Sequence, residues 1–249
     1  MSVNLPRGYR LAVTGAGSGI GRAACHYFAD RGCRVAALDR DETTVRQTAA
    51  GHDGIDCAHV IDITDAAATA SGFETVRRAL GGLDGVVNCA GITGRTNVRS
   101  AEVDLADFDR VYRINLLGAL IVSQAVLPAM IAQASGRLLH VASIAGKDGN
   151  AGMAAYSATK AGLIGLVKVM GKEYAQTGVT INALAPAVIQ TPMVEALPET
   201  QVRYMTDKIP MKRTGTLAEA CEMIAWIVSP ACSFTTGFTF DLSGGRAVY

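Results

Sequence analysis

The chain has 249 residues, of which 49% are hydrophobic and 18% are charged, and its formal net charge at pH 7 is +1. This length and apolar content are ample for one compact domain. A near-neutral chain lacks the excess of basic residues that draws a protein to nucleic acid or to an anionic membrane. We therefore expect neither of these as a partner, and a small molecule instead.

The sequence does not predict export, membrane insertion or a metal site. Its N-terminus shows no charged start followed by an apolar core and a cleavage site. The most apolar stretch, 111–131, is interrupted by Arg113, Asn115 and Pro128, so no run reaches the ~20 residues that a membrane span needs. The six cysteines lie far apart, without the spacing of a zinc site or a disulfide framework. We expect a cytoplasmic protein with reduced thiols and no bound metal.

Short apolar runs typical of buried strands alternate along the chain with helical patterns. The predicted strands are 10–14, 34–38, 57–61, 83–88, 137–142, 179–184 and 238–242. The predicted helices are 20–31, 41–50, 65–80, 103–133, 154–176 and 216–229. This alternation, with right-handed crossovers, predicts an α/β fold: a doubly wound parallel sheet of about seven strands with helices on both faces. The sequence shows no repeat or linker, so residues 1–249 are predicted to form a single domain.

A glycine-rich turn, residues 14–21, joins the first predicted strand to an apolar helical pattern. Glycine permits a tight turn and a close approach of the backbone, and a helix N-terminus offers free N–H groups to a phosphate. Strand, turn and helix in this order are the context of a dinucleotide-binding motif, whereas no Gly-Lys-Ser/Thr closes the turn as in a P-loop. The predicted contacts are Gly15, Gly17, Ser18, Gly19, Ile20 and Gly21.

Asp39 ends the second predicted strand, about twenty residues after the glycine turn, where an acid binds the adenosine ribose hydroxyls. A carboxylate there repels the extra phosphate of NADP, so we expect NAD as the cofactor. Arg40 is the counter-argument, because a neighbouring arginine can accept that phosphate. Its alternative interpretation is a solvated loop residue.

Three side chains predict proton transfer at an oxygen atom. Tyr156 and Lys160 are four residues apart and share one face of a predicted helix. A nearby ammonium favours phenolate, so we expect Lys160 to lower the pKa of Tyr156 from about 10. Ser143 follows the fifth predicted strand, at the strand ends where open parallel sheets bind ligands. Each residue alone is also typical of a solvated helix or a turn.

With these motifs in this order, the chain resembles the short-chain dehydrogenase/reductase family over nearly its whole length. The glycine turn matches the family's motif, and Asp62-Ile63 matches its adenine-binding acid. The chain departs from the family at two positions. Cys89, within Asn88-Cys89-Ala90-Gly91, replaces an asparagine of the family, and Ala187, after Pro186, replaces a glycine; the Cys89 departure is the milder one. If position 187 needs the conformational freedom of glycine, the loop beside the nicotinamide must differ in this chain. The family's remaining motifs are matched by Thr191-Pro192-Met193 and Ser243-Gly244-Gly245.

The resemblance implies a Rossmann-fold, NAD-dependent oxidoreductase that interconverts a secondary alcohol and a ketone. In the implied active site, Tyr156 transfers the proton, Ser143 hydrogen-bonds the substrate oxygen, Lys160 holds the nicotinamide ribose, and Asn115 holds a water. Further implied cofactor contacts are Asp62, Ile63, Asn88, Ala90, Gly91, Pro186, Ala187, Val188, Ile189 and Thr191, together with Tyr156 and Lys160. The family also implies a homotetramer, built through the helices at 103–133 and 154–176.

Substrate contacts are expected from the loop after Ser143 and from the segment after the sixth strand. The candidates are Ser143, Ala145, Lys147, Asn150, Met153, Tyr156, Ala187 and Val188. The irregular stretch 187–214, which contains three prolines, is predicted to be a mobile lid over the substrate. Arg246 is a candidate to reach the pocket of a neighbouring subunit.

The substrate itself is less constrained. The loop after Ser143 is similar to that of family members that oxidise sugar-derived hydroxy acids, so we expect a small polar hydroxy acid or a sugar-derived compound. A 3-oxoacyl thioester reductase, acting on acyl carrier protein or CoA esters, is the alternative; Asp39 disfavours it because reductive biosynthesis usually draws on NADPH. A catalytically inactive Rossmann protein that senses nucleotide is more remote, because such proteins usually lose the tyrosine or the lysine.

Overall fold

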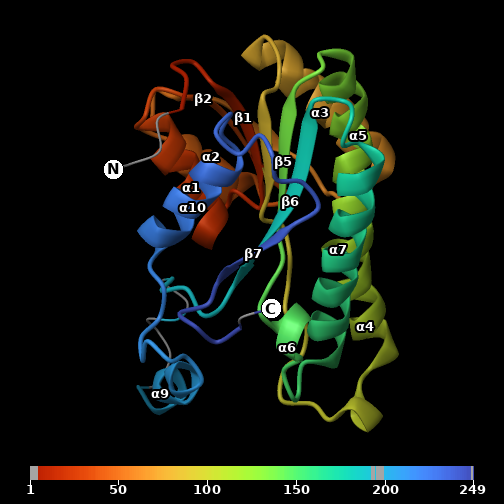
Figure 1. Cartoon of the computed structure of the whole chain (residues 1–249), viewed down its shortest axis with the longest axis vertical. Coiled ribbons are helices and arrows are strands. Elements are labelled where there is room, and N and C mark those ends of the chain that lie inside the picture. Colours follow the sequence, from red (N-terminus) through yellow and green to blue (C-terminus); the bar gives the residue numbers. More distant parts are fainter. Residues whose placement is uncertain (1–4, 192–193, 195–198, 248) are drawn as a thin grey trace.

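The computed structural model describes residues 5–191, 194, 199–247 and 249. Its centre is a seven-stranded sheet in the order β3-β2-β1-β4-β5-β6-β7, and all neighbouring strands are parallel (Figure 1). The strands are β1 (Arg10–Thr14), β2 (Arg34–Asp39), β3 (Ile55–Val60), β4 (Gly85–Asn88), β5 (Gly136–Val141), β6 (Val179–Pro186) and β7 (Thr239–Leu242). The order reverses between β1 and β4, and a ligand crevice is expected at the carboxyl ends of strands at such a point.

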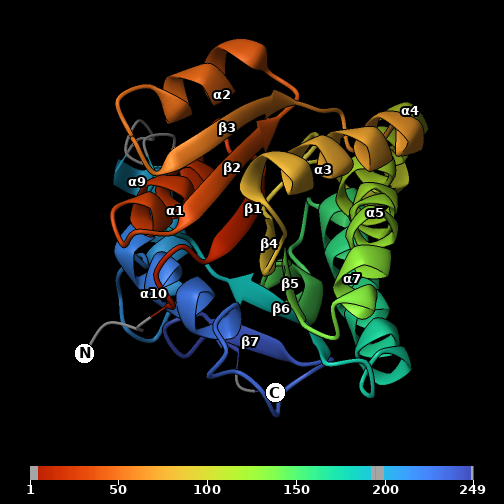
Figure 2. The same ribbon diagram turned by 90° about the horizontal axis from the view of Figure 1, so that it is seen from above.

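Helices cover both faces of the sheet (Figure 2). One face carries α3 (Ala66–Leu80), α5 (Gly118–Ala132) and α7 (Ala154–Glu173). The other face carries α1 (Gly19–Ala29), α2 (Glu42–Ala49) and α10 (Leu217–Ile227). Within β1, Ala12 packs with the first group, whereas Leu11 and Val13 pack with the second. Because both faces are buried, the strands read as continuous apolar runs in the sequence.

The predicted α/β fold is confirmed, and the predicted strands and helices are present with ends that differ by at most three residues. The helix predicted at 103–133 is instead α4 (Leu105–Tyr112), a π-helical turn (Arg113–Leu117) and α5, preceded by a 3₁₀ turn (Ser100–Glu102). The sequence did not predict α6 (Ala145–Asp148) or α9 (Glu199–Asp207). A helix of one turn such as α6 is too short to show an apolar period.

The stretch Leu105–Ala132 is long and apolar enough to cross a membrane, judged by length and composition alone. Half of its most apolar window is buried inside the protein. Side chains of α5, among them Val122, Val126 and Met130, belong to the core on the α3–α7 face of the sheet. Core packing therefore accounts for the apolar character of this helix.

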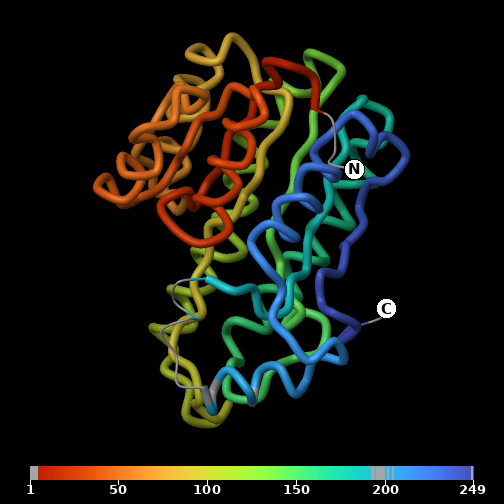
Figure 3. The backbone as a smooth tube through the Cα atoms, turned by 90° about the vertical axis from the view of Figure 1, so that its left-hand side faces the viewer, coloured from red at the N-terminus to blue at the C-terminus, as the bar shows by residue number. Residues whose placement is uncertain are grey.

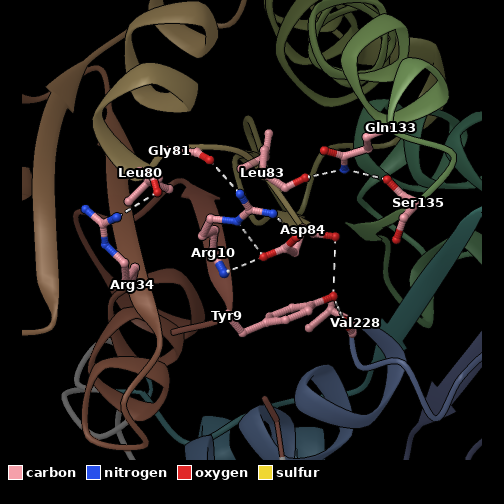
Figure 4. Close-up of polar contacts among 10 residues, drawn as sticks. All are labelled: Tyr9, Arg10, Arg34, Leu80, Gly81, Leu83, Asp84, Gln133, Ser135 and Val228. Atoms are coloured by element: carbon pink, nitrogen blue, oxygen red, sulfur yellow. Dashed lines mark hydrogen bonds and ion pairs between the residues drawn. The ribbon is translucent and has the colours of Figure 1, made fainter. Parts of the chain in front are cut away.

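A cluster of hydrogen bonds fixes the amino ends of the strands (Figure 4). Arg10 donates to both carboxylate oxygens of Asp84 and to the Gly81 carbonyl at the end of α3, and Arg34 donates to the Leu80 carbonyl. Arginines near a helix C-terminus satisfy carbonyls that have no partner within the helix. Structural contacts thus occupy one end of the sheet, which leaves the carboxyl ends of the strands for the site.

Candidate active site

A groove of about 370 Å³ lies at the carboxyl ends of β1, β2 and β4, where the strand order reverses. Of the predicted cofactor contacts, it is lined by Gly15, Gly17, Ser18, Asp39, Arg40, Asp62, Ile63, Ala90 and Gly91. Ser18 also lines an adjoining hollow of about 360 Å³, together with Gly19 and Thr191. The structure therefore gathers residues from five separate segments of the sequence, as a dinucleotide-binding crevice requires.

The glycine turn is built so that only glycine fits at its key positions. Gly15 has φ of +66°, and a Cβ there would lie 2.7 Å from the Ala90 nitrogen. A Cβ on Gly21 would overlap the Gly15 carbonyl. Ser18 is the N-cap of α1, but its side chain makes no capping hydrogen bond. The first N–H groups of α1 are thus open to an anion, and these features fit the pyrophosphate of a dinucleotide.

Asp39 lines the groove next to the glycine turn. Its Oδ2 accepts a hydrogen bond of 2.8 Å from the Gly17 N–H, and its Oδ1 accepts one of 3.1 Å from the Asp41 N–H. The carboxylate is therefore fixed against the turn, where it meets ribose hydroxyls favourably and repels a 2′-phosphate. Arg40 is exposed and also lines the groove.

Ser143 and Tyr156 meet at the carboxyl end of β5. Ser143 follows that strand, Tyr156 lies in the first turns of α7, and the Ser143 side chain is near enough to lower the pKa of the Tyr156 phenol. Ser143 Oγ also accepts a hydrogen bond of 3.1 Å from the Ala145 N–H, which fixes its orientation. The structure thus brings near each other the two hydroxyl side chains that the sequence analysis expects to meet one substrate oxygen.

Lys160 lies one turn further along α7 and is buried. Its Nζ donates a 2.7 Å hydrogen bond to the Val141 carbonyl and lies 5.8 Å from the centroid of the Tyr156 ring. A Cβ on Gly91 would come within 3.2 Å of both Lys160 Nζ and Asn115 Oδ1. Gly91 also lines the groove, so Lys160 Nζ and Asn115 Oδ1 lie directly behind a groove residue that has no side chain.

The prediction that Lys160 lowers the pKa of Tyr156 is wrong for this structure. Burial raises the pKa of Tyr156, and the Ser143 hydrogen bond opposes this only in part. Burial also lowers the pKa of Lys160 to about 8, because desolvation penalises its charged form. The two residues share one helix as their spacing indicates, but the sequence did not show that Lys160 would be buried and Tyr156 half-buried.

Asn115 lies in the π-helical turn between α4 and α5, and such bulges are frequent at functional sites. Its Oδ1 accepts from the Ile92 N–H, and its Nδ2 donates to the Ile92 carbonyl, both at 2.8 Å. Nδ2 also reaches the Thr159 hydroxyl at 3.3 Å. Asn115 therefore ties the segment after β4 to the π-helical turn and to α7, next to Lys160.

His140 of β5 was not predicted as a site residue, although it is hydrogen-bonded to Asn88, one of the predicted cofactor contacts. Asn88 Nδ2 and the imidazole Nδ1 of His140 are 3.0 Å apart, and its Nε2 lies 3.0 Å from the Ser123 hydroxyl. Thr14 donates to Asn88 at 2.5 Å, so the chain of contacts spans β1, β4, β5 and α5. Burial, followed by the positive charge of Lys160, lowers the pKa of His140 to about 3 and keeps the ring neutral. A histidine inside an apolar strand was the available signal.

The loop after Ser143 contains the predicted substrate contacts, and two of them are engaged elsewhere. Lys147 forms an ion pair of 2.8 Å with Asp241. Asn150 Oδ1 accepts a 2.6 Å hydrogen bond from Arg246 of the same chain. Arg246 thus contacts Asp148 and Asn150 of its own chain, and its predicted contact with a neighbouring subunit stays a prediction. Ala145 is buried and Met153 is half-buried in this loop.

The segment after β6 accepts alanine at position 187, where the family has glycine. This residue has no left-handed φ, and its N–H donates a 2.9 Å hydrogen bond to the Leu242 carbonyl, so alanine is accommodated without strain. Of the predicted lid, residues 192–193 and 195–198 lie outside the described residues. The part that follows contains α9, which lies at the same end of the molecule as the loop after β5 (Figure 3).

Comparison with known proteins agrees with this geometry. Residues 10–202 match the family described as short chain dehydrogenase. A 2-dehydro-3-deoxy-L-rhamnonate dehydrogenase (NAD(+)) of Sphingomonas sp. is 42% identical, over 95% of this chain and 94% of the relative. The 3-oxoacyl-(acyl-carrier-protein) reductase FabG of Thermotoga maritima is 37% identical, over 95% and 96%. An NAD+-bound xylitol dehydrogenase structure superposes with a TM-score of 0.90 at 29% identity, over 96% of this chain and 99% of that one. The chain belongs to the short-chain dehydrogenase family.

Proposed function

We propose that this protein is an NAD+-dependent dehydrogenase that oxidises a secondary alcohol on a small polar hydroxy acid or sugar-derived compound. The observation that carries the cofactor choice is the Asp39 carboxylate, fixed against the glycine turn at 2.8 Å. The relative named as a sugar-acid dehydrogenase, at 42% identity over nearly the whole chain, supports the substrate class.

The groove residues would hold the cofactor in a defined order. The glycine turn and the N-terminus of α1 would bind the pyrophosphate, Asp39 the adenosine ribose, and Asp62 the adenine. Lys160 would bind the nicotinamide ribose and Thr191 the carboxamide, as in the family. Bound NAD+ would supply the hydride acceptor, which no side chain of the protein provides.

Proton transfer is the work of the chain's own residues. Tyr156 takes the proton from the substrate hydroxyl, and Ser143 donates a hydrogen bond to the same oxygen as it becomes a carbonyl. Because burial raises the pKa of Tyr156, the phenol is protonated at neutral pH and is ready to donate in the direction of ketone reduction. Alcohol oxidation requires the phenolate, so its rate rises with pH. Asn115 positions the segment that faces Lys160 and would hold a water that carries the proton to solvent.

A substrate screen tests this proposal. Purified protein is assayed with NAD+ and with NADP+ against polyols, sugar-derived hydroxy acids and 3-hydroxyacyl thioesters. We expect the highest kcat/KM with NAD+ and a hydroxy acid of sugar origin. Highest activity with NADPH and a 3-oxoacyl thioester would instead establish the alternative function, which the 37% identity to FabG favours. Binding of NADH without turnover of any alcohol would point to an inactive nucleotide sensor.

We also propose a cytoplasmic homotetramer. Exposed apolar side chains on α4 and α7 support it, notably Leu105 of α4, which is 81% exposed, and Val169 of α7. Among the described residues, β7 is an edge strand of the sheet, and Phe234 and Phe238, which come just before it in the sequence, are exposed. Sedimentation of the wild type and of Val169→Glu and Phe238→Glu tests this assembly; a monomeric wild type would contradict it.

A further inference from the structure

Two ion pairs join α6 to the end of the chain. Lys147 pairs with Asp241 of β7 at 2.8 Å, and Arg246 pairs with Asp148 at 3.1 Å. Lys147 and Asp148 are thus neighbours in α6 with opposite charges, and each pairs with an oppositely charged residue near the C-terminus. Tyr249 adds a 2.6 Å hydrogen bond from its hydroxyl to the Lys147 carbonyl. Figure 1 shows the C-terminus beside α6. We call these contacts the C-terminal clasp.

The clasp is better shielded from water than an ordinary surface pair. The side chains of Lys147 and Asp241 are 10% and 23% exposed, and those of Arg246 and Asp148 are 11% and 26% exposed. The surface pair of Arg78 with Glu74 is 76% and 41% exposed by comparison. Exposed pairs contribute little because water and salt screen them, whereas half-buried, hydrogen-bonded pairs can hold a segment in place.

The segment that the clasp holds begins with Ser143, one of the two proposed reacting groups. Ser143 Oγ accepts a hydrogen bond from the backbone N–H of Ala145, which is the first residue of α6. Gly146 packs directly on the backbone of α7 at Lys160, where an added Cβ would lie 2.6 Å from the Lys160 carbonyl carbon. The position of α6 therefore sets how Ser143 lies relative to α7.

A second link runs from the clasp to Tyr156. Arg246 Nη2 donates to Asn150 Oδ1 at 2.6 Å, and the Asn150 N–H donates to Ser157 Oγ at 3.0 Å. Ser157 follows Tyr156 in the first turns of α7. Arg246 thus contacts both ends of the 148–150 segment, and through it the turn of helix that presents the phenol.

We propose that Arg246 and Lys147 are positioning residues, and that the C-terminal clasp holds the 143–153 segment so that Ser143 and Tyr156 meet the same substrate oxygen. Among the described residues, none that forms the clasp lines the cofactor groove. Loss of the clasp therefore lowers turnover and leaves cofactor affinity unchanged. This inference rests on the proposed role of Ser143 and Tyr156 in proton transfer.

The test compares Arg246→Gln with Arg78→Gln, a matched change at the exposed pair on α3. For Arg246→Gln we expect kcat to fall by about tenfold or more, because small misplacements of reacting groups are costly. The dissociation constant for NADH, measured by fluorescence titration, should stay within twofold. Arg246→Lys should recover part of the loss, and Arg78→Gln should behave as the wild type. Wild-type kcat in Arg246→Gln would overturn the proposal.

Charge reversal separates positioning from a general loss of folding. Asp148→Arg and Arg246→Asp should each lower kcat, and the double variant should recover most of it, because the pair is rebuilt with opposite signs. A double variant as inactive as either single one would overturn the proposal.

Hydrogen exchange gives a readout that does not depend on the reaction. In Arg246→Gln, amides of 143–153 should exchange faster than in the wild type, while those of β1 and α1 stay unchanged. Unchanged exchange in 143–153 would overturn the clasp even if the wild type oxidises no alcohol. If the wild type shows no turnover but the exchange result holds, the proposed function fails and the clasp stands.

Discussion

Gly146 is the point at which the loop after Ser143 touches the helix that carries Tyr156 and Lys160. Its φ lies outside the left-handed region, so an alanine there meets no backbone strain. The Cβ of Gly146→Ala would, however, lie 2.6 Å from the Lys160 carbonyl carbon and 2.8 Å from the Ala161 nitrogen. Both atoms are helix backbone and cannot rotate away, so α6 must move as a unit.

The size of the effect follows from that displacement. To reach an ordinary contact of 3.4 Å, α6 must retreat by about 0.8 Å from α7, and Ser143 moves with it. A displacement near 1 Å in reacting groups can cost on the order of 10²-fold in rate. Overpacking costs about 1–3 kcal/mol of stability, offset by the ~0.5–1 kcal/mol that replacing a helical glycine returns. We expect kcat to fall about 10–100-fold and stability to fall by about 1–2 kcal/mol.

Gly165→Ala is the matched control, because Gly165 lies in α7 and nothing in its own chain is within 4 Å of its added Cβ. Since α7 also belongs to the proposed assembly face, sedimentation must first show that this variant assembles as the wild type does. It should keep wild-type kcat and gain up to about 1 kcal/mol from helix propensity. Steady-state kinetics, NADH titration and urea unfolding are measured on both variants. If Gly146→Ala is as active and as stable as Gly165→Ala, the contact between α6 and α7 does not set the position of Ser143.

Three further outcomes are expected. Asp39→Ser removes the charged hydrogen bonds to ribose, so kcat/KM with NAD+ should fall about 10–100-fold and the preference for NAD+ over NADP+ should become smaller. An unchanged ratio of kcat/KM with NAD+ to kcat/KM with NADP+ would contradict the role of Asp39. His140 has its pKa lowered to about 3 in the folded protein, whereas the usual histidine pKa is about 6.5. Below pH 6.5 the unfolded chain therefore binds a proton that the folded protein does not, and the free energy of unfolding falls by about 1.4 kcal/mol per pH unit. His140→Gln should flatten urea-unfolding stability between pH 4 and 6.5, and an identical slope would refute this. Lys160→Met removes a buried ammonium, which is charged and costly to bury below pH 8. The free energy of unfolding at pH 7 should therefore rise by about 1–2 kcal/mol, while turnover is lost. A variant less stable than the wild type would contradict the cost assigned to the buried charge.

The fold and the cofactor side of the site could be predicted from sequence because their signals are local. The glycine turn, the strand before it and the acid at Asp39 lie within thirty residues, and backbone geometry brings them together. The spacing of Tyr156 and Lys160 on one helix likewise placed them on one face.

The features that the sequence did not show depend on burial and on contacts between distant residues. The raised pKa of Tyr156 arises from desolvation, which no spacing reveals. Lys147 and Asn150 looked like free loop residues, but their partners Asp241 and Arg246 lie more than ninety residues away in the sequence. The role of α6 was missed for the same reason, since its position is set by β7 and the residues after it.

Tyr156→Phe tests the central claim most directly, because it removes one oxygen atom and leaves the ring in place. A positioned proton donor or acceptor contributes about 10²–10⁴-fold to rate, so kcat should fall by that factor while the dissociation constant for NADH stays unchanged. Cofactor affinity measured on the same sample serves as the folding control. Turnover of Tyr156→Phe close to that of the wild type would show that proton transfer takes place elsewhere.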